Sequence, residues 1–350
     1  MHRLIWTSVI ALMFLLSGSA ISQEHRKPGH IFRGDDVLAV TITAPFKKLM
    51  RERPEDTDLP GKIAYTDAAG ETVEIDIGVR TRGRYRRQMK ICPFAPIRLK
   101  FDKKQIENTV FRKQGKLKLV THCRNRSTRY EQLVLKEFLV YKILNQVTDY
   151  SFRVRLLRIT YVDSDNPRDQ QVRYGFLIEN KERMAKRIRT PHVVVKSSSI
   201  SALNGEYNNL VSVFQYFVAN TDFSPVAGAP GDNCCHNTQL FGNPGELLYA
   251  IPYDFDMAGM TDAPYAEPNP KFKIRNVRQR LYRGRCNNNI HLENSLQAFR
   301  ENKDAFHALV EDMPDLTGSS KTSMFALMES FYKLIGNPKA VDKKLTRRCV

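Results

Sequence analysis

The apolar pattern of the chain changes its period near residue 130, and this change limits the possible folds more than any other feature. Before it, short segments alternate apolar and polar residues, as half-buried strands do. From 130 to 147 the apolar residues recur every three or four positions, which indicates an amphipathic helix. Two more strand patterns follow, and the region from about 288 to 347 is helical in pattern. Strands with helices segregated beside them predict an α+β fold with an antiparallel sheet.

The expected strands are rich in β-branched residues and are bounded by turn residues. In one of them Ile97, Leu99 and Phe101 share one face, while Arg98 and Lys100 share the other. A polar loop is expected to join the two strands that follow the long helix. The expected strand segments are 36–45, 62–83 (a hairpin with its turn near Ala69-Gly70), 95–101, 115–123, 153–163, 172–181 and 246–256, and a second buried helix is expected at 208–220.

The first 23 residues have the pattern of a secretory signal peptide. A basic residue, Arg3, precedes an apolar run at 4–16 and small residues at 17–20. A membrane anchor is the alternative, but the apolar run is short for a span. We expect a signal peptide at 1–23, a polar leader at 24–35, and a mature chain without a transmembrane span that is secreted or periplasmic.

The cysteine content fits an oxidising compartment, because six cysteines allow up to three disulfides. Cys234 and Cys235 are adjacent, so we expect each to pair with a distant segment and not with the other. A zinc site is disfavoured because the chain has no CxxC pair. The cysteines are Cys92, Cys123, Cys234, Cys235, Cys286 and Cys349.

The chain is strongly basic, with a net charge of +18. Such a charge favours anionic partners, such as nucleotide phosphates or acidic polymers. Nucleic acid is not expected as a partner of a secreted chain. The basic residues are densest at 80–90, in a turn that contains Gly83. Backbone amides and guanidinium groups at such a turn suit phosphate oxygens, and a solvated basic hairpin is the alternative.

Two further polar segments carry carboxylates. The segment 220–237 contains Asp222, Asp232, His236 and Asn237. A carboxylate and an amide oxygen on one loop can orient a hydroxyl group and hold a magnesium ion. The alternative is a loop in which these residues only form caps and turns.

The second carboxylate segment, PYDFDMAG, follows an apolar strand pattern. Asp254 and Asp256 lie on one side of an extended backbone, and Phe255 points away. Two carboxylates on one side repel each other unless a cation lies between them, which favours a metal site. A buried structural pair bonded to backbone amides is the alternative.

The order of these segments resembles that of the spore-coat CotH kinases, a family of atypical kinases, over roughly residues 36–260. The motifs that carry the resemblance are LAVTITAP, GVRTRGRYRR, PIRLKF, GKLKLV, YEQLVLKEFLVYKIL, YGFLIENKERMAKR, HNTQLF and PYDFD. The resemblance implies a two-lobed protein-kinase-like fold with ATP between the lobes. The N-terminal lobe would be β-rich with one long helix (36–182), and the C-terminal lobe would be mainly helical and carry the metal and catalytic loops (183–350).

The resemblance also implies roles for residues at the catalytic and metal sites. Asp254, Asp256 and Asn237 would bind magnesium or manganese. Asp222 would be the catalytic carboxylate, because Asn220-Thr221-Asp222 is similar to the catalytic loop of HipA-like kinases. Asp232 is the alternative, since it precedes Asn237 by the five residues usual in kinases.

The nucleotide would be held by the N-terminal lobe. Lys100 or Lys118 would contact its phosphates, Glu137 would pair with that lysine, and Glu179 would lie near the linker between the lobes. The turn at Arg82 and Gly83 would also contact the nucleotide. The resemblance therefore implies a kinase that transfers phosphate from ATP to a protein or glycan acceptor.

The chain departs from the family pattern in its arginine-rich turn, in the long loop at 224–231 and in the adjacent cysteines. The second hypothesis is consequently a catalytically inactive, kinase-like binding protein for an anionic partner.

Overall fold

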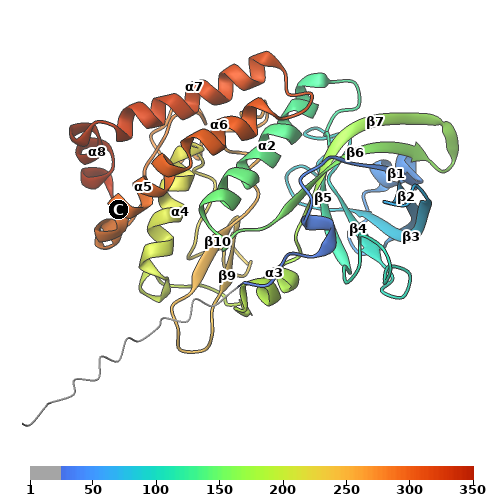
Figure 1. The fold of residues 1–350 in the computed structure, drawn as a ribbon, viewed down its shortest axis with the longest axis horizontal. Coiled ribbons are helices and arrows are strands. Elements are labelled where there is room, and N and C mark those ends of the chain that lie inside the picture. Colours follow the sequence, from blue (N-terminus) through green and yellow to red (C-terminus); the bar gives the residue numbers. More distant parts are fainter. Residues whose placement is uncertain (1–24) are drawn as a thin grey trace, which may run out of the picture.

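The fold is a mixed α+β arrangement with one large mixed sheet and one small sheet, seen here in a computed structural model that describes residues 25–350. The expected signal peptide lies outside these residues. In Figure 1 the large sheet occupies one side of the molecule and the C-terminal helices the other. The strands are β1 (Leu38–Ala44), β2 (Leu59–Thr66), β3 (Thr72–Thr81), β4 (Ile97–Phe101), β5 (Lys116–Val120), β6 (Val154–Asp163), β7 (Asn166–Ile178), β8 (His192–Val193), β9 (Thr238–Phe241) and β10 (Tyr249–Pro252).

The helices include the long helix and the C-terminal helices that the periodicity predicts. The predicted helix at 130–147 is observed as α2, and the predicted helix at 208–220 as α4. Two short helices, α1 and α3, are additional to the helices that the sequence analysis predicts. The helices are α1 (Phe46–Glu52), α2 (Thr128–Val147), α3 (Lys181–Ile188), α4 (Gly205–Phe217), α5 (Leu292–Glu301), α6 (Lys303–Glu311), α7 (Gly318–Ile335) and α8 (Pro338–Lys344), with 3-10 turns at η1 (His30–Phe32), η2 (Ile200–Ala202), η3 (Cys286–His291) and η4 (Thr346–Arg348).

The large sheet closes into a barrel in the order β1-β2-β3-β4-β5-β7-β6. Its neighbouring strands are antiparallel except β1 and β6, which pair in parallel from Leu38–Leu157 to Ala44–Asp163. The prediction of an antiparallel sheet therefore holds for every neighbouring pair of strands in the barrel except this one. A closed ring of seven strands cannot alternate in direction throughout, so at least one pair must be parallel.

The β6–β7 hairpin is longer than the sequence predicts. The polar stretch expected as a loop forms the first part of β7, where residues 166–170 are exposed. Its backbone still pairs with β6, as at Val162 and Gln170. Both faces of this part of the hairpin lie outside the core, so it shows no apolar alternation.

Two hydrophobic cores organise the molecule. One fills the barrel and includes Ile42, Val79 and Leu99, none of which is accessible to solvent. The other joins α4 and the C-terminal helices to the buried side chains of α2, such as Leu139. The long helix, which the resemblance assigns to the N-terminal lobe, thus packs into the second core while also contacting β7 (Figure 1).

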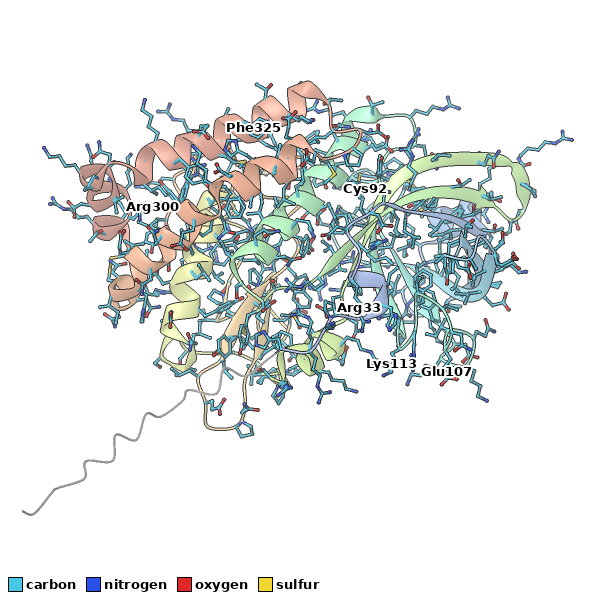
Figure 2. All side chains as sticks on the ribbon, in the orientation of Figure 1. Arg33, Cys92, Glu107, Lys113, Arg300 and Phe325 are labelled. Atoms are coloured by element: carbon cyan, nitrogen blue, oxygen red, sulfur yellow. A yellow bond between two sulfur atoms is a disulfide. The ribbon has the colours of Figure 1, made fainter. Side chains whose placement is uncertain are left out.

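All six cysteines form disulfides: Cys92 pairs with Cys123 and Cys286 with Cys349. Cys92 lies beside the barrel, where Figure 2 labels it. Cys234 pairs with Cys235, so the prediction that each would reach a distant segment is wrong. The other four cysteines are paired with one another, which leaves these two without a distant partner. Among residues 25–350, no helix has the length and apolar character needed to cross a bilayer.

Candidate functional site

The three polar segments that the sequence singles out meet at one cleft of about 580 Å³. The basic turn after β3 forms one wall, the loop after α4 forms another, and the residues after β10 form the floor. Gly83 has a φ of +83°, a conformation that favours glycine, where the chain turns along the cleft. The predicted site residues that line it are Arg82, Gly83, Lys118, Asp222, Asp232, Asn237, Asp254 and Asp256.

The β9–β10 ladder brings Asn237 and Asp254 together. Thr238 pairs with Pro252 at the end of this antiparallel ladder, and the amide of Tyr253 donates to the carbonyl oxygen of Asn237 at 3.1 Å. Asn237, just before β9, and Asp254, just after β10, therefore lie next to each other. Both Asn237 and Asp254 have left-handed backbones, with φ of 49° and 65°, which Asn and Asp tolerate better than most residues.

Asp222 is held from two sides. The His236 ring lies 2.8 Å from one carboxylate oxygen of Asp222, and the Asn237 amide donates to the other at 2.9 Å. The Asp222 hydrogen bond raises the pKa of His236. Arg283 donates to the carbonyl oxygens of Thr221 and Phe223 at 3.1 and 2.8 Å. This carboxylate thus has a fixed position at the edge of the cleft while remaining partly exposed.

Asp232, the alternative catalytic residue, lies at the mouth of the cleft. Its two carboxylate oxygens accept hydrogen bonds from Arg84 at 2.5 and 2.6 Å, and the Arg84 hydrogen bond lowers the pKa of Asp232. This exposed ion pair joins the basic turn to the loop after α4. Asp232 is therefore engaged in a bridge between two walls, whereas Asp222 is not paired with an arginine or lysine among the described residues.

Arg86 occupies the centre of a group of three carboxylates, of which two are buried and Asp254 is partly exposed. Its guanidinium lies 3.0 Å from Asp256, 3.1 Å from Asp254 and 3.3 Å from Glu137. Burial disfavours its charge, yet the carboxylates raise the pKa of Arg86 well above its usual value. Burial raises the pKa of Glu137 to about 8 and that of Asp256 to about 6.

This cluster changes two expectations. The cation between Asp254 and Asp256 is the Arg86 guanidinium, where the sequence suggests a metal ion. Glu137 pairs with Arg86, so the predicted pairing of Glu137 with Lys100 or Lys118 is wrong. Sequence reasoning missed Arg86 because one of five arginines between 80 and 87 has no distinguishing spacing. Its only signal is that it follows Gly83 in the turn.

Three basic side chains that line the cleft, Arg82, Arg98 and Lys118, form no ion pair with a carboxylate among residues 25–350. Lys118 lies 4.4 Å above the ring of Tyr253, and burial lowers its pKa to about 7. Arg98 is its neighbour across the β4–β5 ladder, and the Nε and Nη2 atoms of Arg98 are buried without hydrogen-bond partners. A buried cation without a partner is costly, so Lys118 and Arg98 are suited to contact an anion.

Three predicted nucleotide-binding residues, Lys100, Glu137 and Glu179, do not line the cleft. Lys100 is exposed and lies 3.5 Å from Asp58, two residues beyond Arg98 along β4. Glu179 is buried and forms an ion pair with Arg187, with N–O distances of 2.9 and 3.0 Å. Of the two candidate lysines, only Lys118 lines the cleft.

A second pocket of about 300 Å³ adjoins the cleft and shares Arg98, Lys118 and Tyr253 with it. Its lining includes the apolar side chains of Phe152 and Ile178. The polar side chains of Asn180 and Gln239 also line it, as does Glu179 near the end of β7. The cleft therefore extends from a carboxylate-rich end, past two cations, to a partly apolar end.

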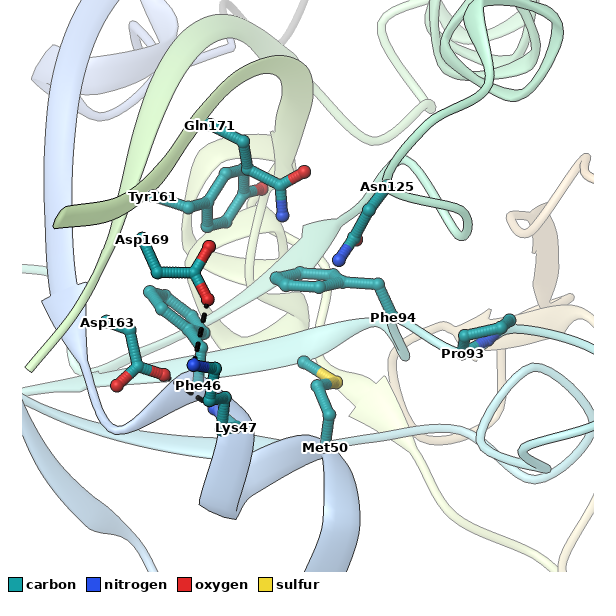
Figure 3. A pocket seen from close by; sticks show the side chains of 10 residues that line it. All are labelled: Phe46, Lys47, Met50, Pro93, Phe94, Asn125, Tyr161, Asp163, Asp169 and Gln171. Atoms are coloured by element: carbon teal, nitrogen blue, oxygen red, sulfur yellow. Dashed lines mark hydrogen bonds and ion pairs between the residues drawn. The ribbon is translucent and has the colours of Figure 1, made fainter. Parts of the chain in front are cut away.

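Another cavity, of about 180 Å³, lies beside α1 and the β6–β7 hairpin (Figure 3). Phe46, Phe94 and Tyr161 form most of its apolar wall. Its lysine, Lys47, already lies 3.2 Å from Asp169. None of the predicted site residues lines this cavity, and its cation is paired, so the cleft is the stronger candidate.

Magnesium or manganese fits the cleft by the chemistry of its donors, because Asp222, Asn237 and Asp254 offer carboxylate and amide oxygens. In the part of the chain that the structure describes, no three His, Cys, Asp or Glu side chains converge as a protein-only metal cage. Magnesium sites for nucleotides commonly use one or two carboxylates together with substrate phosphates. The donor set therefore suits a metal that arrives with a phosphorylated ligand.

A comparison of the chain with protein-family models finds no matching family, and a comparison with curated proteins finds no significant match. The kinase-like interpretation consequently depends on the sequence motifs and on the geometry of the cleft.

Proposed function

We propose that the protein is a kinase-like phosphotransferase that uses ATP with magnesium or manganese and transfers phosphate to a protein or glycan acceptor. The barrel would be the N-terminal lobe of a kinase-like fold, and the helical part the C-terminal lobe. The observation that supports this most is the position of Lys118 and Arg98 between the carboxylate wall and the partly apolar pocket. This order of chemical groups matches the order of metal, phosphates and base in a bound nucleotide.

The residues of the cleft would divide the work of phosphoryl transfer. Lys118 and Arg98 would contact the phosphate oxygens, and the base would enter the pocket beside Phe152 and Ile178. Asp254 and Asn237 would hold the metal ion, which supplies positive charge to the phosphates when it is bound.

Asp222 would accept the proton of the attacking hydroxyl group. Its hydrogen bonds with His236 and Asn237 fix the carboxylate before the acceptor binds. Such fixed positioning is the main contribution that a protein makes to phosphoryl transfer. The hydroxyl oxygen then forms the new bond to phosphorus as the bond to the leaving phosphate oxygen breaks.

Thermal unfolding of the oxidised protein with ATP tests the proposal. At a ligand concentration one hundred times the dissociation constant, binding stabilises a protein by about 2.7 kcal/mol. We expect a stabilisation by ATP that requires the metal ion and is lost in Asp254→Asn. The control is Asp76→Asn, which changes an exposed carboxylate on β3 by the same chemistry. The absence of any nucleotide-dependent stabilisation in the wild type would rule out ATP as the ligand.

One observation favours the second hypothesis, an inactive binding protein for an anionic partner. Arg86 already forms ion pairs with Asp254 and Asp256, so these carboxylates have a cation beside them without a metal ion, and an anion could bind to Lys118 and Arg98. This hypothesis predicts that ATP stabilises the protein equally with and without metal, and that Asp254→Asn has no effect. The same unfolding experiment therefore separates the two functions.

A further inference from the structure

A separate pocket of about 210 Å³ lies on the other side of the Glu179–Arg187 ion pair from the cleft. Three segments that are distant in the sequence form it: the N-terminal stretch before η1, the loop before β5 and helix α3. Backbone bonding fixes the first of them, because the amide of Arg26 donates to the carbonyl oxygen of Arg187 at 2.9 Å.

The lining of this pocket is almost entirely cationic. Its acidic residue, Glu179, is already bound by Arg187. None of its other basic side chains forms an ion pair with a carboxylate among residues 25–350. The basic side chains that the argument uses are Arg26, Arg33, Arg112, Lys113, Arg183 and Lys186.

Figure 2 labels Arg33 and Lys113, which lie near each other at the same edge of the barrel. These charges also act on His30. Its pKa is lowered, first by burial and second by the nearby charges of Arg33, Arg112 and Lys113. So many cations around one small concavity repel each other unless anions lie between them.

A buried amide also lines the pocket. Gln114 is only 1% exposed and lines the pocket, and its Oε1 atom has no hydrogen-bond partner. A buried carbonyl oxygen without a partner needs a donor, so Nε2 is the atom of this amide that could donate to an anion. Gly29 allows the close approach of the N-terminal stretch, since a Cβ atom there would lie 2.7 Å from Nε2 of Gln114. The Gln114 amide is thus held at the wall of a cationic pocket.

We propose that this pocket binds a compact oligoanion that carries two or more phosphate or sulfate groups. Arginine side chains on three segments can each make two hydrogen bonds to a tetrahedral oxyanion, and the Gln114 amide can make one more. A single small anion would neutralise little of this charge, whereas a ligand with several such groups would bridge all three segments. The proposal does not depend on the kinase-like function, because it uses no residue of the cleft.

Calorimetric titration of the full chain without divalent metal tests the proposal. The probes are inorganic tripolyphosphate, sucrose octasulfate and inorganic monophosphate. We expect one of the two oligoanions to bind at a single site and monophosphate to bind much more weakly. The stronger of the two distinguishes a phosphate ligand from a sulfate ligand. Failure of both oligoanions to bind would overturn the proposal.

Matched variants then locate the site. Arg112→Gln with Lys113→Gln should weaken oligoanion binding by about tenfold or more, since two charged contacts are lost. Lys103→Gln with Lys104→Gln removes the same charge from exposed positions and should change affinity by less than about twofold. Equal losses in both pairs would mean nonspecific attraction to a basic protein and would overturn the proposal.

Two further variants test whether the oligoanion binds in the cleft instead of the pocket, and whether net charge alone explains its binding. Arg98→Gln with Lys118→Gln alters the cleft and should leave oligoanion binding intact; loss of binding there would assign the ligand to the cleft and overturn the proposal. Gln114→Leu changes no charge and should still weaken binding. Thermal unfolding of each variant checks that it is folded, and unchanged affinity in a folded Gln114→Leu protein would contradict the role of the amide.

Discussion

The side chain of Asn237 donates hydrogen bonds to both the backbone carbonyl oxygen and the carboxylate of Asp222, at 2.8 and 2.9 Å. These two bonds connect the start of β9 to the loop after α4, across fifteen residues that include the Cys234–Cys235 disulfide. The amide nitrogen of Asn237 is used in this way, which leaves its oxygen as the atom that could face a metal ion. Asn237 therefore has a structural task that is separate from any role as a metal ligand.

Asn237→Asp should destabilise the protein, because a second carboxylate would face Asp222 in place of a donor. We expect a loss of about 1–3 kcal/mol in the free energy of unfolding, the usual cost of a partly buried acceptor without a donor. Urea denaturation measures it. The control, Asn108→Asp, makes the same change at an exposed position without a side-chain bond. Equal stability of the two variants at neutral pH would show that the Asn237 bonds contribute little.

Arg86→Met should be strongly destabilising at neutral pH. It leaves Asp254 and Asp256 without their shared cation and removes the partner of Glu137, and breaking a buried ion pair from one side costs about 3–5 kcal/mol. A divalent ion could then take the place of the guanidinium, so magnesium should restore part of the stability of this variant while changing that of the wild type less. Denaturant unfolding with and without magnesium measures both effects.

Arg126→Met is the matched control for this experiment, since Arg126 is exposed. It should unfold like the wild type under both conditions. If magnesium stabilises the wild type as much as Arg86→Met, the guanidinium does not compete with a metal ion for these carboxylates.

The stability of the protein should depend on Glu137 between about pH 4.5 and 8. Burial raises the pKa of Glu137 from 4.5 to about 8, so in this range the folded protein holds a proton that the unfolded chain has lost. The stability that this group contributes is present at low pH and falls as pH rises, by up to about 1.4 kcal/mol per pH unit. Glu137→Gln removes this titration.

Denaturation of the wild type and Glu137→Gln at several pH values measures the difference. The stability of the variant relative to the wild type should increase from pH 5 to pH 8. Glu107→Gln, at an exposed position, should run parallel to the wild type. Parallel profiles for all three proteins would mean that Glu137 is ionised across this range and fully compensated by Arg86.

Much of the local structure could be predicted because it depends on short-range patterns. The alternation of Ile97, Leu99 and Phe101 places three side chains in the barrel core, and the same alternation turns Arg98 toward the cleft. The period of 130–147 identifies α2. The spacing of Asp254 and Asp256 predicts a metal ion between two carboxylates, whereas the cation that contacts both in the structure is Arg86.

The remaining features depend on contacts that local patterns do not encode. The parallel β1–β6 pair follows from closure of the barrel, which no single strand pattern reveals. Arg86 can be identified as the shared cation only from the contact between the turn after β3 and the end of β10, which the sequence does not show. Lys100 and Lys118 have the same residue type and similar strand patterns, and only the position of each along its strand decides that Lys118 lines the cleft.

The affinity of the cleft for ATP should fall as pH rises from 6 to 8, because Lys118 loses its charge in this range. Burial lowers its pKa to about 7, so its ammonium group is present at pH 6 and mostly absent at pH 8. Removal of one charged contact costs about tenfold in affinity.

Lys118→Arg is the control, because arginine keeps its positive charge at both pH values. ATP and His236 titrate in the same way in both proteins, so the difference in affinity between the variant and the wild type reports on the lysine alone. Calorimetry should show a steeper loss of affinity for the wild type than for Lys118→Arg, and Lys118→Met should bind weakly throughout. If the wild type and Lys118→Arg lose affinity in parallel, Lys118 either remains charged at pH 8 or does not contact the phosphates.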